Sequence, residues 1–162
     1  MEDISAGVLQ WLEDSTWAAT IRQSSWLYPW LEIAHIAGIT ILVGAAVLFD
    51  LRLLGFSKHL PVRGLAVHLL SWSQKGLVLV IPSGILLFIT NAVALGHDPV
   101  FGIKMGLLFL AGLNAATFHR FSSHLLRSWN ENDSLPVRAK LAAIFSIILW
   151  VGVIACGRLL AY

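Results

Sequence analysis

Two side chains that can bind a metal lie inside long apolar stretches of the chain. His35 interrupts WLEIAHIAGITILVG, and Lys104 stands near the start of FGIKMGLLFLAGLN. An ionisable group inside such a stretch is costly, and it marks either a functional site or a buried pair. The imidazole of His35 can bind haem iron within a helical bundle. The alternative is a histidine that only hydrogen-bonds to a neighbouring helix.

Lys104 has three candidate roles beside such a haem. It could be the opposite axial ligand, a partner of a haem propionate, or a lysine that extends its amine to the membrane surface. Glu32 precedes His35 by three residues and so shares its helix face. A Glu32–Lys104 ion pair is therefore a simpler alternative. A di-metal carboxylate site is disfavoured because it needs a second E-x-x-H motif.

A second group of polar residues lies towards the other ends of the apolar stretches. His68 and His119 could hold a second haem as a bis-histidine pair. Alternatively, His119 pairs with Asp50, and His68 lies at the membrane interface. The amide of Asn114 is expected to form a hydrogen bond between helices.

The composition is that of an integral membrane protein. Of the 162 residues 57% are hydrophobic and only 12% are charged, and the mean hydropathy is +0.78. A soluble domain carries about 25% charged residues. The single cysteine excludes a disulfide framework within the chain and a four-cysteine metal site. A net charge of +2 gives no indication of nucleic-acid binding.

Four apolar stretches are long enough to cross a bilayer, which takes about 20 residues. We expect spans at about residues 30–54, 76–95, 101–119 and 141–160. Residues 4–24 have amphipathic spacing and contain Trp11 and Trp17, with Trp26 and Tyr28 just beyond, which predicts a helix at the membrane interface. A frayed soluble tail is the alternative. The predicted fold is an all-α, integral membrane four-helix bundle forming one domain over residues 1–162.

The basic residues predict the orientation of these spans. One side carries Arg52, Lys58, Arg63, Lys75, Arg120, Arg127, Arg138 and Lys140. The other side carries only Arg22, Lys104 and Arg158. By the positive-inside rule the first side is cytoplasmic, so both termini are expected on the outer face.

The two halves of the chain resemble each other. FSKHLPVRGLA follows the first span, whereas FSSH, an insertion and LPVRAKLA follow the third. A shift of 69 residues places His35 on Lys104, Phe49 on Phe118 and Asp50 on His119. Two similar hairpins of one orientation would be related by a twofold pseudo-axis along the membrane normal. His35 and Lys104 would then flank one outer site, and Asp50 and His119 would pair near the inner surface. Two unrelated hairpins are the alternative.

Several segments carry a family resemblance. WLYPWLEIAHIAGI, FDLRLLG, FGIK and LAGLNAATFHR resemble a family of short bacterial four-span membrane proteins known only as a domain of unknown function. More distantly, His35 and Lys104, the latter followed by His119, resemble the first and third helices of HemJ-type protoporphyrinogen oxidases. That resemblance implies b-type haem and redox chemistry in a bacterial inner membrane. The chain lacks the tryptophan expected shortly after the histidine, so the resemblance implies haem binding rather than the porphyrinogen reaction.

These observations predict a haem b protein of the inner membrane with a redox or electron-transfer role, which would make it a candidate haem-dependent oxidoreductase. A quinone or another redox molecule is the expected partner, besides membrane lipid. The helix faces are rich in glycine, which would allow the chain to assemble as a homo-oligomer. Two other functions compete with this one. The histidines could bind or transport a copper-like metal, or the chain could be a membrane scaffold without catalysis.

Overall fold

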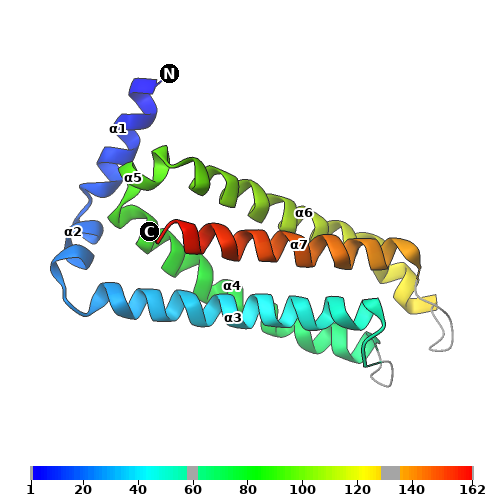
Figure 1. Cartoon of the computed structure of the whole chain (residues 1–162). Coiled ribbons are helices and arrows are strands. Elements are labelled where there is room, and N and C mark those ends of the chain that lie inside the picture. Colours follow the sequence, from blue (N-terminus) through cyan, green and yellow to red (C-terminus); the bar gives the residue numbers. More distant parts are fainter. Residues whose placement is uncertain (1, 58–61, 129–135, 162) are drawn as a thin grey trace.

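The computed structural model describes residues 2–57, 62–128 and 136–161, which form helices joined by short turns (Figure 1). Four of the helices are long: α3 (Leu27–Leu54), α4 (Val62–Thr90), α6 (Pro99–Ser128) and α7 (Val137–Leu159). Three are short: α1 (Glu2–Glu13), α2 (Thr16–Gln23) and α5 (Ala92–His97). The predicted all-α class is confirmed for this part of the chain.

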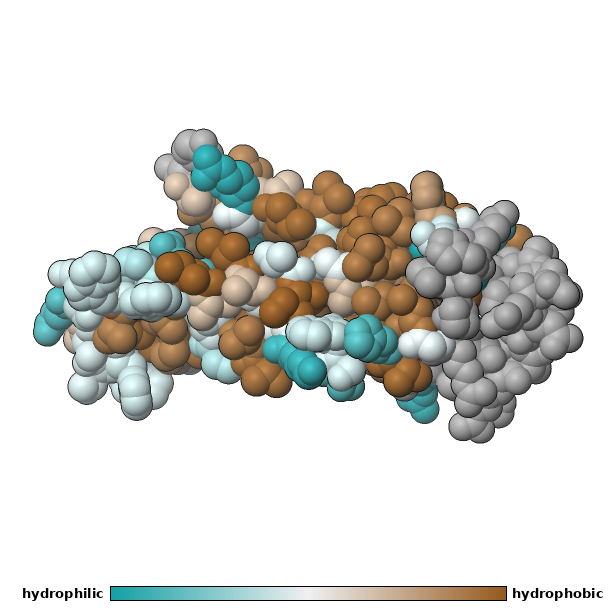
Figure 2. Space-filling view, turned by 90° about the horizontal axis from the view of Figure 1, so that it is seen from below, coloured by the Kyte–Doolittle hydropathy of each residue, from teal (hydrophilic) through white to brown (hydrophobic). Residues whose placement is uncertain are grey.

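Each of the four long helices is long and apolar enough to cross a membrane. Their large apolar side chains face outward in many places, and Val78 and Phe109 are both 71% exposed. Brown, apolar residues cover most of the middle of the face in Figure 2, and paler residues gather at one end. Soluble monomers rarely expose so continuous an apolar surface. The distribution is typical of helices surrounded by lipid.

The long helices pack as two antiparallel pairs. α3 packs along α4, α6 packs along α7, and the pairs meet mainly through α3 and α7. α3 and α6 run in the same direction, and the two chain termini lie at the same end of the bundle (Figure 1). Residues near the starts of α3 and α6 therefore share one end, and residues near their ends share the other.

Glycines allow α3 and α4 to approach closely along their middle turns. A Cβ added at Gly76 would lie 2.8 Å from the backbone nitrogen of Leu42 and 3.0 Å from the carbonyl oxygen of Gly38. A Cβ at Gly38 would lie 2.8 Å from a methyl group of Val80. We call this contact between Gly38 and Gly76 the glycine seam. It fixes which face of α3 is turned towards α4.

The most deeply buried apolar cluster lies at the end of the bundle where α3 stops. Leu53, Val62 and Ala143 are each 1% exposed, and Phe49 and Phe118 pack against them. α3 ends at Leu54 and is capped by Gly55, whose φ of 105° is left-handed and favours glycine. This cluster joins both helix pairs and closes that end of the bundle.

Helix bounds in the N-terminal region and α4 differ from the sequence-based expectation. The interfacial helix expected over residues 4–24 is two helices, because Ser15 is extended and its hydroxyl accepts a hydrogen bond from the backbone of Ala18. α4 begins at Val62 rather than residue 76, since the polar residues of its first turns can face outward within a continuous helix. It ends at Thr90 rather than residue 95, because Asn91 has a non-helical φ of −142°.

The short helices are held against the turn between α4 and α5. The Arg22 guanidinium donates to the carbonyl of Thr90 at 3.0 Å and to that of Glu13 at 2.7 Å. The Glu13 carboxylate accepts from the backbone N–H of Val93 at 2.8 Å. These hydrogen bonds hold α1 and α2 against one end of the bundle. Trp17 of α2 is 73% exposed at that end.

Candidate functional site

His35 projects from α3 towards α4, where a serine holds one of its ring nitrogens. Nδ1 of His35 lies 3.0 Å from the hydroxyl oxygen of Ser83, which is buried. That hydroxyl donates its own proton to the carbonyl of Leu79 at 2.5 Å. Ser83 therefore accepts a hydrogen bond from His35, and this assigns the proton of a neutral ring to Nδ1. Nε2 then carries the lone pair.

The ring of His35 also rests on a glycine of α4. A Cβ added at Gly84 would lie 2.9 Å from Cε1 of His35. Because Gly84 has no side chain, the imidazole fits against α4, and the hydrogen bond to the neighbouring Ser83 orients the ring.

Lys104 extends from α6 to the same end of the bundle. Its Nζ lies 3.9 Å from where a Cβ of Gly157 on α7 would be. The amine is half-buried and close enough to His35 for an electrostatic interaction. The structure therefore brings His35 and Lys104 to one region, from α3 and α6. Glu32 is exposed, and Lys104 points instead towards α7.

The other predicted ligands are not brought together in the described part of the chain. His68 is exposed on α4, and its Nε2 accepts a hydrogen bond from the Trp72 indole at 3.2 Å. Lys75 lies over the same indole, 4.4 Å from its centroid. The side chain of His119 lies outside the described residues. A second haem between His68 and His119, and the Asp50–His119 pair, therefore stay predictions.

A cavity of about 520 Å³ lies between the two helix pairs, further along the bundle than His35. Its walls come from α3, α4, α6 and α7 and are mostly apolar. Neither His35 nor Lys104 lines it. The polar side chains among its described lining residues are Asp50, Ser73, Gln74, Asn114 and Ser146. A volume of this size is typical of a small-molecule site.

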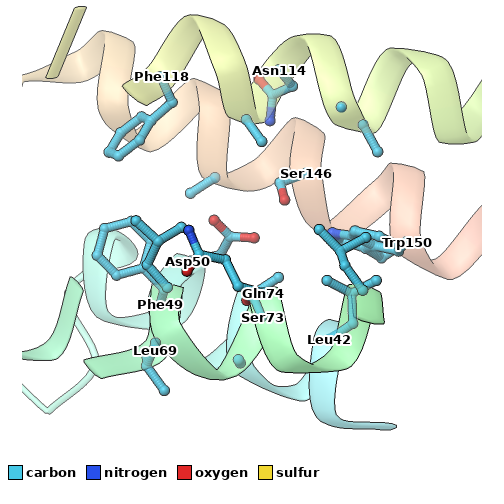
Figure 3. A pocket seen from close by; sticks show the side chains of 18 of the residues that line it. Leu42, Phe49, Asp50, Leu69, Ser73, Gln74, Asn114, Phe118, Ser146 and Trp150 are labelled. Atoms are coloured by element: carbon cyan, nitrogen blue, oxygen red, sulfur yellow. The ribbon is translucent and has the colours of Figure 1, made fainter. Parts of the chain in front are cut away.

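Asp50 is the ionisable group among the described residues of this cavity (Figure 3). Its side chain is 6% exposed, and it accepts a hydrogen bond from the hydroxyl of Ser146 on α7. Its Oδ2 has no hydrogen-bond partner within the described ranges. The Asn114 amide donates to the carbonyl of Ala142 at 3.1 Å, which is the interhelical role expected of it.

Ser83, Gly84 and Ser146 were not predicted from the sequence. A serine in an apolar helix gives little signal, because it can return its hydroxyl proton to its own helix, as Ser83 does. The segment Pro82-Ser83-Gly84 interrupts the apolar residues of α4 and was the available hint. Only the packing of α3 on α4 shows that this interruption faces His35.

A copper-like site stays a prediction. The described ranges contain no group of three or more histidine, cysteine or acidic side chains that could hold a metal ion. Haem iron needs only one or two protein ligands, so this finding does not bear on haem binding.

Together the helices and the site define an all-helical protein with four candidate membrane spans and polar residues between its helix pairs. The chain belongs to a family of unknown function (DUF6644), whose model matches residues 9–162. This confirms the predicted membership of such a family, whereas the HemJ-type resemblance stays a prediction. No curated protein and no solved structure matches the chain.

Proposed function

We propose that the chain is an integral membrane protein of the bacterial inner membrane with four spans and with both termini on the outer face. The four long apolar helices and the common end of the two termini support this arrangement. The excess of lysine and arginine at the opposite end supports the orientation.

Labelling with a membrane-impermeant thiol reagent tests the orientation in intact spheroplasts. In a Cys156→Ser background, Ala6→Cys should react from outside, and Ser57→Cys should react only after lysis. Ala6 and Ser57 are both exposed and belong to opposite ends of the bundle. Labelling of Ser57→Cys before lysis, with Ala6→Cys protected, would show the reverse orientation.

We further propose that the protein binds b-type haem at His35 and has a redox or electron-transfer role. The observation that carries this proposal is the hydrogen bond from Nδ1 of His35 to Ser83. Metal-binding histidines commonly donate their second ring N–H to an oxygen, which fixes the tautomer and directs the lone pair at the metal. The hydrogen bond to Ser83 is therefore the kind expected of a histidine that binds haem iron.

Lys104 would act beside His35, as the opposite ligand or as a partner of a haem propionate. Its half-buried amine near His35 supports either role. When bound, haem would supply one-electron chemistry between a quinone or similar donor and an acceptor.

Absorption spectra of detergent-purified protein, oxidised and then reduced with dithionite, test the haem proposal. Wild type expressed with added haem precursor should show a Soret band that sharpens on reduction. His35→Ala should lose most of the band, and Lys104→Ala should lose it or shift it. His97→Ala is the control, because His97 is exposed and bonds within its own helix to Val93.

Two results would overturn the haem proposal. One is the absence of a Soret band in folded wild type. The other is full haem content in both His35→Ala and Lys104→Ala, which would move the ligands elsewhere. A His35→Ala variant that changes only thermal stability, in a colourless protein, would favour the scaffold function instead.

A further inference from the structure

The cavity between the helix pairs contains a carboxylate with no cationic side chain beside it among the described residues that line the cavity. Asp50 is 6% exposed, and Oδ2 has no hydrogen-bond partner in the described part of the chain. Ser146 donates to the carboxylate from α7, but a hydroxyl supplies no charge. Figure 3 shows the carboxylate of Asp50 directed into the space between α3 and Ser146. A buried carboxylate is stabilised when a charged hydrogen-bond donor lies beside it.

The groups around Asp50 show which donor the cavity lacks. No lysine, arginine or histidine occurs among its described lining residues. Asn114 already uses its amide nitrogen on the carbonyl of Ala142. Ser73 and Gln74 of α4 add uncharged polar groups, and the rest of the wall is apolar and includes Leu42, Phe49 and Phe118. The cavity thus combines one acidic group with apolar walls and enough volume for a small amphiphile.

We propose that this cavity binds an apolar molecule with a single ammonium group, which donates to Oδ2 of Asp50. The ammonium supplies the positive charge and the hydrogen bond that the described residues around Asp50 do not provide. The hydrocarbon part of the ligand packs against Leu42, Phe49 and Phe118. This site is separate from the His35 region and does not depend on haem.

Fluorescence titration with dodecylammonium tests the proposal in detergent-purified full-length protein. Trp150 lines the cavity, so its emission should change on binding, and Trp150→Phe should remove that change. Dodecanol has the same chain and no charge, so it should bind wild type roughly 30-fold more weakly, as expected when one member of a buried charge pair is lost.

Asp50→Asn keeps the shape of the side chain and removes its charge. Binding of dodecylammonium should fall roughly 30-fold, and the preference over dodecanol should disappear. Asp14→Asn is the matched control, because Asp14 is an exposed carboxylate outside the cavity that bonds only Gln10 among the described residues. Equal preference for dodecylammonium in Asp50→Asn and wild type would overturn the proposal.

A second pair of variants tests the cavity without touching the charge. Gly112 lines the cavity, and a Cβ there would meet nothing within 4 Å. Gly112→Leu should therefore keep the fold and weaken dodecylammonium binding at least tenfold. Gly106→Leu is the control, since Gly106 is equally open on α6 but does not line the cavity. Unchanged binding in a folded Gly112→Leu variant would place the ammonium site elsewhere, even if Asp50→Asn failed to fold.

Discussion

The rings of Phe49 and Phe118 meet edge to face, with centroids 5.7 Å apart and planes inclined at 76°. They project from α3 and α6, and they occupy equivalent positions in the internal repeat. Three more equivalent pairs line the cavity: Leu42 and Ala111, Ala45 and Asn114, and Ala46 and Ala115. The twofold pseudo-axis itself stays a prediction, because α3 packs closely on α7 whereas the equivalent helices α6 and α4 have no comparable contact among the described residues.

A double-mutant cycle on the two rings should show that they are coupled. Aromatic pairs of this geometry contribute about 1 kcal/mol beyond the area they bury. Phe49→Leu and Phe118→Leu together should therefore destabilise less than the sum of the single changes, by about that amount. Unfolding in mixed micelles measures the coupling. Phe49→Leu with Phe88→Leu is the control and should be additive, because Phe88 stacks on Phe101 instead. Additivity in the first pair would contradict the contact.

The glycine seam should be intolerant of even one methyl group. Gly76→Ala would place its Cβ 2.8 Å from a backbone nitrogen of α3, which cannot move as a side chain can. We expect a loss of about 1–3 kcal/mol in unfolding free energy, as for overpacked cores. Gly106→Ala is the matched control on α6, where a Cβ meets nothing, and it should be neutral or slightly stabilising. A neutral Gly76→Ala would show that α3 and α4 lie further apart.

Sequence alone predicted the features that depend on composition and length. Apolar stretches of about 20 residues specify membrane helices whatever they pack against, so the four long helices were expected. The repeat placed His35 and Lys104 at equivalent positions, and in the structure they are close enough to interact electrostatically, while a shared site stays a prediction. The helix ends near Ser15 and Asn91 were missed, because each depends on one backbone conformation or one cap.

The details of the site depend on which helix faces which, and composition does not encode that. Ser83 and Ser146 look alike in sequence, yet one holds His35 and the other bonds Asp50. The cavity itself arises because α6 packs on α7 and leaves space beside α4. Such a space has no signature in either helix alone.

Removing the Ser83 hydroxyl should weaken haem binding without removing an axial ligand. Second partners of metal-binding histidines typically affect affinity about 10- to 100-fold. Ser83→Ala should therefore lower haem occupancy while keeping the shape of the Soret band, whereas Ser83→Thr should retain much of the wild-type affinity. Ser71→Ala, at an exposed position of the same helix, should behave as wild type. Haem titration of the purified apoprotein measures this. If Ser83→Ala bound haem with wild-type affinity, the hydrogen bond between His35 and Ser83 would play no part in haem binding.

The Glu13 carboxylate should protect the start of α5 from local opening. α5 has no side-chain cap of its own from Asn91, and Glu13 supplies one by accepting from the Val93 N–H at 2.8 Å. A helix cap contributes about 1 kcal/mol, so Glu13→Ala should speed hydrogen exchange in α5 about fivefold. Glu13→Gln keeps an acceptor oxygen and should have a smaller effect, while Asp14→Asn should have none. Hydrogen exchange read by mass spectrometry over residues 91–97 measures this. Unaltered exchange in Glu13→Ala would mean that the N-terminal helices do not stabilise α5.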